Sequence, residues 1–103
     1  MSTRADAAAA LKRHLRERVL ILDGAMGTMI QAARPTEADF RGELFTKHPK
    51  DLKGANDVLV LTRPELIRSI HEAYLRAGAD RTETNTFNAT RLGLAEYALG
   101  DHI

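Results

Sequence analysis

The sequence predicts an α/β domain in which a strand and a helix follow one another twice. Strand character is found at Val19–Leu22 and again at Asp80–Phe87. Helical patterns follow each of these segments, and strands that alternate with helices are typical of βαβ units and a parallel sheet. Because two strands cannot form a sheet that is covered on both faces, we expect the 103 residues to be the opening part of a larger α/β domain.

The composition is typical of a globular domain rather than a disordered tail, with 44% hydrophobic and 28% charged residues. Apolar stretches never approach the roughly 20 residues that a membrane span requires. A net charge of +1 argues against nucleic-acid and membrane partners. The chain has no cysteine, which excludes a thiol nucleophile and a cysteine zinc site built from this chain alone. These features fit a reducing cytoplasm, which is the predicted location.

Residues 1–18 are predicted to form an N-terminal helical extension. Ser2 or Thr3 can cap this helix, and Leu11 and Leu15 form a thin apolar face at i, i+4 spacing. An arginine-rich transit peptide is the alternative, but acidic residues within the segment and the lack of a cleavage signal argue against it.

The segments that follow predict one strand, one short helix and a long loop. Val19–Leu22 is continuously apolar, as expected for a strand covered on both faces. Ala25–Ala33 fits a short helix after a glycine-containing turn. Residues 34–57 are irregular, and a loop of this length is uncommon unless it is functional or packed over something. Val58–Leu61 is interpreted as a buried lead-in to the next helix, with a short strand as the alternative.

Two further helices are predicted from caps and periodicity. Thr62 and Glu65 have the spacing of a capping box, and Gly78 is placed to end that helix. Its apolar stripe consists of Leu66, Ile70, Ala73, Tyr74 and Ala77. Asn88 is the predicted cap of the last helix, which Gly100 ends. Its shared face consists of Leu92, Ala95 and Leu99.

A first group of candidate binding residues follows the first strand: Asp23, Gly24, Gly27 and Thr28. Ligands of α/β folds bind at the carboxyl ends of strands. The glycines allow close approach of a ligand, and the N–H groups at the start of the next helix favour an anion. Asp23 would bind an ammonium group, so that the turn as a whole suits a zwitterion. The alternative is a plain strand-to-helix turn with Asp23 as its cap.

A second group follows from the alternation of the second strand, which places Glu83, Asn85 and Phe87 on one face. Unpaired buried polar groups cost roughly 1–3 kcal/mol each, so a strand end this polar is expected to face a ligand or a pocket. A polar edge strand is the alternative. The four histidines lack any metal-ligand spacing and receive no role.

At these residues the chain resembles the start of the homocysteine-binding module of the cobalamin-dependent methionine synthases. The matching stretches are Ile21–Gln31, Glu37–Glu43, Asp51–Asp57, Thr62–Glu65 and Glu83–Asn88. Betaine-type homocysteine methyltransferases share the first stretch and are less similar at Asp51–Asp57 and at Glu83–Asn85.

This resemblance implies a (β/α)₈ TIM barrel, of which the chain holds the first two β/α units, with residues 19–103 as a partial homocysteine-binding barrel domain. It implies that zinc, held by cysteines of later strands, binds homocysteine as a thiolate that accepts a methyl group from methylcobalamin. Methyltetrahydrofolate and cobalamin would bind to further modules. The chain itself would bind neither metal nor cofactor, would hold no catalytic residue and would be inactive alone. Its part of the homocysteine pocket would consist of Asp23, Gly24, Gly27, Thr28, Glu83 and Asn85.

Two other functions stay open from the sequence. One is a cobalamin-independent homocysteine or thiol methyltransferase, and the other is a non-catalytic module that binds a small molecule. The chain also departs from the family at Arg81 and Thr82, where two large aliphatic residues are expected. A buried, unpaired Arg81 would be costly, so we expect Arg81→Ile to stabilise a complete barrel.

Overall fold

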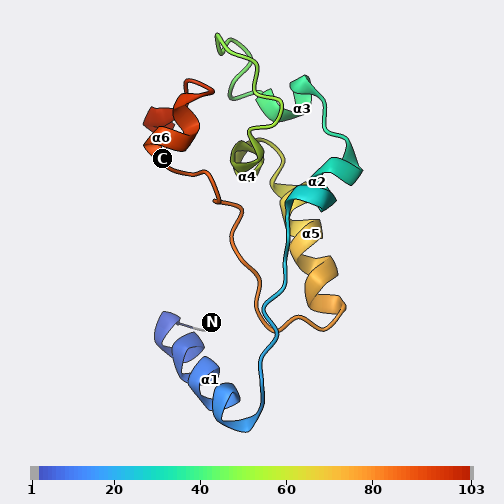
Figure 1. Ribbon diagram of the computed structural model, residues 1–103, viewed down its shortest axis with the longest axis vertical. Helices are drawn as coiled ribbons and strands as arrows, with labels where there is room; N and C mark the ends of the chain where they lie inside the picture. The colour runs from blue at the N-terminus through green and yellow to red at the C-terminus, as the bar shows by residue number, and fades with distance from the viewer. Residues whose placement is uncertain (1–2, 103) are drawn as a thin grey trace.

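The computed structural model describes residues 3–102 and is an elongated, mostly helical structure with extents of 50 × 27 × 25 Å (Figure 1). Its helices are α1 (Arg4–Glu17), α2 (Gly27–Ala33), α3 (Glu37–Arg41), η1 (Asn56–Val58), α4 (Leu59–Thr62), α5 (Pro64–Arg76), α6 (Arg91–Ala95) and η2 (Gly100–His102). Among the described residues, none of these helices has the length and apolar character needed to cross a membrane.

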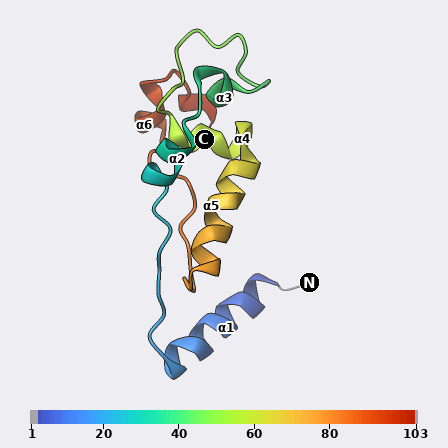
Figure 2. The ribbon, with the colours of Figure 1, turned by 90° about the vertical axis from the view of Figure 1, so that its right-hand side faces the viewer.

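Helix α1 confirms the predicted N-terminal helix. Thr3 is its cap and forms a capping box with Asp6, whereas Ser2 lies outside the described residues. No residue of α1 is buried, and Leu15 is 57% exposed. The helix lies at the far end of the molecule from α2, α3, α4 and α6 (Figure 2). Whether it is a separate unit from residues 19–103 stays a prediction.

Two extended segments run side by side from this end toward the other helices (Figures 1 and 2). Leu22 and Arg81 form a parallel β-bridge, and the Asp23 N–H donates to the Arg81 carbonyl at 3.1 Å. The segments therefore pair in parallel, but only at this bridge. The predicted strand Val19–Leu22 is not covered on both faces, since Val19 is 89% exposed.

The predicted strand Asp80–Phe87 is longer than the paired segment that the structure contains. Beyond the bridge, the Thr86 N–H donates to the Thr84 carbonyl at 3.0 Å, which is a local turn rather than strand pairing. Parallel strands are stable where both faces are covered, and the part of the chain described here places no third strand beside the pair. The TIM barrel itself stays a prediction. Arg81 is exposed, so its charge is not buried in this structure.

The hydrophobic core lies where α2, α3, α4, α5 and α6 meet. Its buried members are Ile30, Phe40, Phe45, Leu52, Ala55, Val58, Leu59, Ile67, Ile70, Leu94 and Leu99. Phe45, Leu52 and Ala55 belong to the segment that the sequence predicts as irregular. That segment is therefore packed over the core rather than extended into solvent.

The segment between residues 34 and 62 also contains helices that the sequence analysis missed. Thr36 and Asp39 form a capping box at the start of α3. The predicted lead-in Val58–Leu61 is helical, so the strand alternative is wrong, and only its first two residues are buried. Helix α2 begins at Gly27, two residues later than expected.

Helix α5 is present as predicted, but its start differs. Arg63 is the N-cap and gives no side-chain cap, while the Thr62 hydroxyl donates back to the Val58 carbonyl at 3.3 Å. The Thr62–Glu65 capping box is therefore wrong, because α4 already occupies Thr62. At the other end the prediction is confirmed: Gly78 follows the C-cap Ala77 with a φ of +116°, a conformation that favours glycine.

Helix α6 is shorter than predicted and starts two residues later. Thr90 rather than Asn88 is its cap, and its hydroxyl accepts the Gly93 N–H at 2.9 Å. Leu94 and Leu99 are buried, whereas Leu92 of the predicted face is 87% exposed. The face is wrong because the helix ends at Ala95 and the chain turns before Leu99.

Candidate functional site

A cavity of about 490 Å³ opens where the two extended segments leave their bridge. It is lined by Leu22, Asp23, Gly24, Ala25, Met26, Gly27, Gly54, Asn56, Asp57, Glu83, Thr84, Asn85, Thr86, Phe87 and Asn88. The structure thus brings together both groups of residues that the sequence analysis selected. Thr28 is the exception, since it is exposed on α2 and does not line the cavity.

The first wall is the turn between Leu22 and α2. The exposed Asp23 carboxylate accepts the N–H of Gly24 at 2.9 Å. A Cβ on Gly24 would lie 3.2 Å from the Cβ of Thr82, so the absence of a side chain lets the two segments approach. Asp23 does not cap α2, because the N-cap is Met26 and has no side-chain hydrogen bond. The Asp23 carboxylate is therefore not used as a helix cap.

The second wall comes from the segment after Arg81. Asn85 is buried, with 6% exposure, and its Nδ2 donates to the Asn56 carbonyl at 2.7 Å. Glu83 and Phe87 lie at the same cavity but are exposed, Phe87 at 96%. The alternation is therefore only partly confirmed, because Thr84 and Thr86 of the opposite face line the cavity as well. Of the three predicted residues, Asn85 is the one that is buried.

A third wall was missed by the sequence analysis and consists of Gly54, Asn56 and Asp57. Burial raises the pKa of the Asp57 carboxyl, and a backbone hydrogen bond from Asn88 opposes that shift in part. The unusual length of the irregular segment was the one available signal that it carries a function. Spacing alone could not show that it folds back onto Asn85.

The lining of this cavity is acidic. Asp23, Asp57 and Glu83 contribute three carboxylates, and no lysine, arginine or histidine is among the lining residues within 3–102. Such a wall favours a ligand that carries an ammonium group. No group of three or more histidine, aspartate or glutamate side chains that could hold a metal ion occurs in the described part of the chain.

The chain also matches a known family. Its residues 20–103 match the family model of homocysteine S-methyltransferase, and this range contains all three walls of the cavity. Methyl transfer to homocysteine is the activity of this family, with homocysteine as its substrate. Because the match covers most of the sequence, the chain belongs to the homocysteine S-methyltransferase family.

Proposed function

We propose that this chain forms the amino-acid end of the homocysteine pocket in a methionine synthase of the cobalamin-dependent type. The single observation that carries the proposal is the common cavity of Asp23, Gly24, Gly27, Glu83 and Asn85. These residues come from two segments that are far apart in the sequence. A family member needs such a pocket to hold the substrate before its sulfur can react.

The acidic lining assigns a role to this chain's own side chains. The Asp23 carboxylate is exposed at the cavity and Glu83 faces the same space, so both can bind the ammonium group of homocysteine. Asn85 is held by Asn56 and keeps one wall in place. These residues bind and orient the substrate, and none of them is proposed to act on the sulfur.

The contact between two stretches of the chain supports the cobalamin-dependent type. The resemblance to that type depends on Asp51–Asp57 and on Glu83–Asn85, and these stretches meet at the hydrogen bond between Asn85 and Asn56. In such an enzyme methylcobalamin would supply the methyl group and zinc would bind the homocysteine sulfur. Methyltetrahydrofolate as the source of that methyl group stays part of the proposal, as does a cytoplasmic location.

Zinc does not fit the residues of this chain. The sequence has no cysteine, and residues 3–102 contain no cluster of acidic and histidine side chains that could replace it. The proposed role of this chain is therefore to bind the amino-acid part of the substrate. A TIM barrel completed by further strands would be the setting of this activity.

Binding of homocysteine to the full chain tests the proposal. Titration followed by amide chemical shifts should perturb Gly24, Gly54 and Asn85, and Asp23→Asn should raise the Kd on the order of tenfold, as for loss of a charged partner. The matched ligand is 4-mercaptobutanoate, which keeps the thiol and carboxylate but lacks the ammonium group. Asp23→Asn should leave its binding unchanged.

The control variant is Asp101→Asn, which removes an exposed carboxylate outside the cavity. It should bind both ligands as the unaltered chain does. An equal loss of both ligands in Asp23→Asn, or shifts spread away from the cavity, would contradict the proposed role of Asp23.

A further inference from the structure

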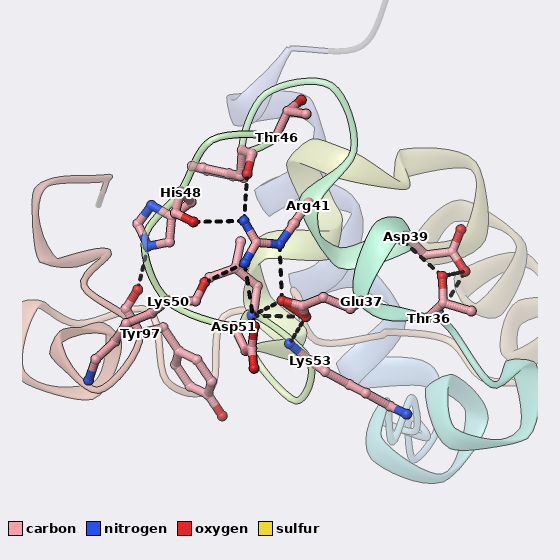
Figure 3. Close-up of polar contacts among 12 residues, drawn as sticks. Thr36, Glu37, Asp39, Arg41, Thr46, His48, Lys50, Asp51, Lys53 and Tyr97 are labelled. Carbon is pink, nitrogen blue, oxygen red and sulfur yellow. Dashed lines mark hydrogen bonds and ion pairs between the residues drawn. The ribbon is translucent and has the colours of Figure 1, made fainter.

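A long segment without regular secondary structure leads to the third wall of the cavity. Hydrogen bonds nevertheless hold this segment in one place. Between α3 and η1 the chain runs through residues 42–55 with turns but no helix of four or more residues. Figure 3 shows Glu37 and Arg41 of α3 at the centre of the polar contacts of this segment, which His48 also ties to the Tyr97 carbonyl at 2.6 Å. A short helix thus carries the side chains that organise a long loop.

Arg41 binds the first half of the loop. Its guanidinium donates to the carbonyls of His48 at 2.7 Å and of Lys50 at 3.0 Å, and more weakly to that of Phe45 at 3.3 Å. The same side chain pairs with Glu37, with Nε donating to Oε1 at 3.2 Å. Five N–H groups in a fixed plane allow one arginine to donate to several carbonyls of a loop at once.

Glu37 binds the second half. Its carboxylate accepts the backbone N–H groups of Leu52 and Lys53, the latter at 2.8 Å. Desolvation acts to raise the pKa of Glu37, but these two N–H groups and the Arg41 charge outweigh it, so the pKa lies below its usual value. Glu37 is therefore ionised at neutral pH and accepts both donors at once.

These contacts end next to the cavity. Lys53 is followed by Gly54, the first residue of the third wall, and the Asn56 N–H donates to the Gly54 carbonyl at 2.9 Å. The Asn56 carbonyl in turn accepts Nδ2 of Asn85 at 2.7 Å. Hydrogen bonds, together with the backbone of residues 53–56 that joins them, thus connect Glu37 to Asn85, the buried polar side chain of the cavity.

We propose that Glu37, supported by Arg41, is a positioning residue of the homocysteine cavity: it fixes residues 52–57 so that the Asn56 carbonyl holds Asn85 in place. The proposal depends on the proposed function for the identity of the ligand, though not for the contact between Asn56 and Asn85. Glu37 does not line the cavity, so its effect on binding is transmitted through the loop.

The test compares Glu37→Gln with Glu43→Gln in the full chain. Glutamine keeps the size of Glu37 but places an NH₂ group against a backbone N–H. Glu43 serves as the control because it lies in the same segment and is exposed. We expect the Asn85 side-chain amide protons of Glu37→Gln to exchange with solvent on the order of tenfold faster, with no change in Glu43→Gln. Homocysteine-induced shifts at Gly54 should decrease in parallel.

A variant that weakens the core at another place separates positioning from general weakening. Ile70→Val in α5 removes one buried methylene of the core without touching Glu37. It should lower the melting temperature but leave Asn85 exchange slow. Should Glu37→Gln fail to fold, Arg41→Lys provides the second variant, since it keeps the charge beside Glu37 but lacks the planar guanidinium that spans the three carbonyls.

The outcomes are distinct. Unchanged Asn85 exchange in a folded Glu37→Gln or Arg41→Lys chain would overturn the positioning role, as would equally fast exchange in Ile70→Val. If homocysteine produces no shifts in the unaltered chain, the proposed function fails, while Asn85 exchange still decides the role of Glu37.

Discussion

Arg18 and Asp80 form a two-point ion pair, with Nη1 to Oδ2 at 2.9 Å and Nη2 to Oδ1 at 2.7 Å. The pair joins the end of α1 to the start of the second extended segment. Asp80 Oδ2 also accepts the N–H of Ile21 at 2.9 Å, directly before the Leu22–Arg81 bridge. The ion pair and this bond therefore set the register with which the two segments reach the cavity.

The Arg18–Asp80 pair predicts a loss of stability in acid. The hydrogen bond from Arg18, with that from Ile21, lowers the pKa of Asp80 to about 2. A carboxyl whose folded pKa is depressed stabilises the fold above its unfolded pKa of about 3.9 and loses that contribution as pH falls toward the folded value. Asp80→Asn should thus be less stable than the unaltered chain at neutral pH, and the difference should vanish between about pH 4 and 2.

Urea titrations at several pH values measure this difference. Other carboxyls also have lowered pKa values, so the quantity to compare is the free energy of unfolding of the unaltered chain minus that of the variant. Asp101→Asn is the control because Asp101 forms no ion pair among residues 3–102. A difference that is independent of pH would show that the ion pair contributes nothing.

Gly24→Ala should disturb the cavity where its first two walls meet. The added Cβ would lie 3.2 Å from the Thr82 Cβ, and the φ of +157° is one that side chains rarely adopt. We expect a loss of about 1–2 kcal/mol in the free energy of unfolding, together with amide shift changes at Glu83. Gly27→Ala is the matched control, since its Cβ would meet nothing within 4 Å. A cost as large in Gly27→Ala would count against the close approach.

The sequence predicts best the elements that local interactions determine. Helix α1 follows from its Thr3 cap, and α5 follows from its periodicity and from Gly78. The Thr62 cap failed although its spacing was correct, because the preceding residues are themselves helical and draw the hydroxyl to the Val58 carbonyl. Local spacing cannot show which of two adjoining helices will use a residue.

Thr90→Ala tests the corrected start of α6. The Thr90 hydroxyl accepts the Gly93 N–H at 2.9 Å, and loss of such a cap costs about 1 kcal/mol. Asn88→Ala should cost less, since the contacts of Asn88 within residues 3–102 come from its backbone: its carbonyl accepts the Thr90 N–H at 2.7 Å, and its N–H donates to the Asp57 carboxyl. Chemical denaturation of both variants measures the comparison, and a larger cost for Asn88→Ala would restore Asn88 as the cap.

The candidate site was predictable only where it follows the extended segments. Asp23 and Glu83 were selected because the ends of parallel strands meet at one edge, and the structure brings them to one cavity. Asn56 and Asp57 were not selected, because their position depends on hydrogen bonds from the segment before them to Glu37. These bonds span 15 and 16 residues of sequence. Such contacts leave no periodic trace in a sequence.

Asp57→Asn should show a pH dependence opposite to that of Asp80→Asn. Burial raises the pKa of Asp57 in the folded chain, so the folded state favours the protonated carboxyl. Its contribution to stability is greatest below the unfolded pKa of about 3.9 and decreases as pH rises through that value toward the folded one. Asp57→Asn should therefore be more stable than the unaltered chain at pH 7, by less than about 1 kcal/mol for a partly exposed group.

The gain from Asp57→Asn should disappear as the pH falls below about 4, where Asp57 is protonated in both states. The same urea titrations measure it, again with Asp101→Asn as control. Homocysteine should bind this variant more weakly, because one of the three carboxylates at the cavity is lost. Stability and binding thus change in opposite directions at neutral pH, as expected for a carboxylate that is kept desolvated to bind a cation. A variant that is less stable at pH 7, or that binds homocysteine as tightly, would show instead that Asp57 serves the fold alone.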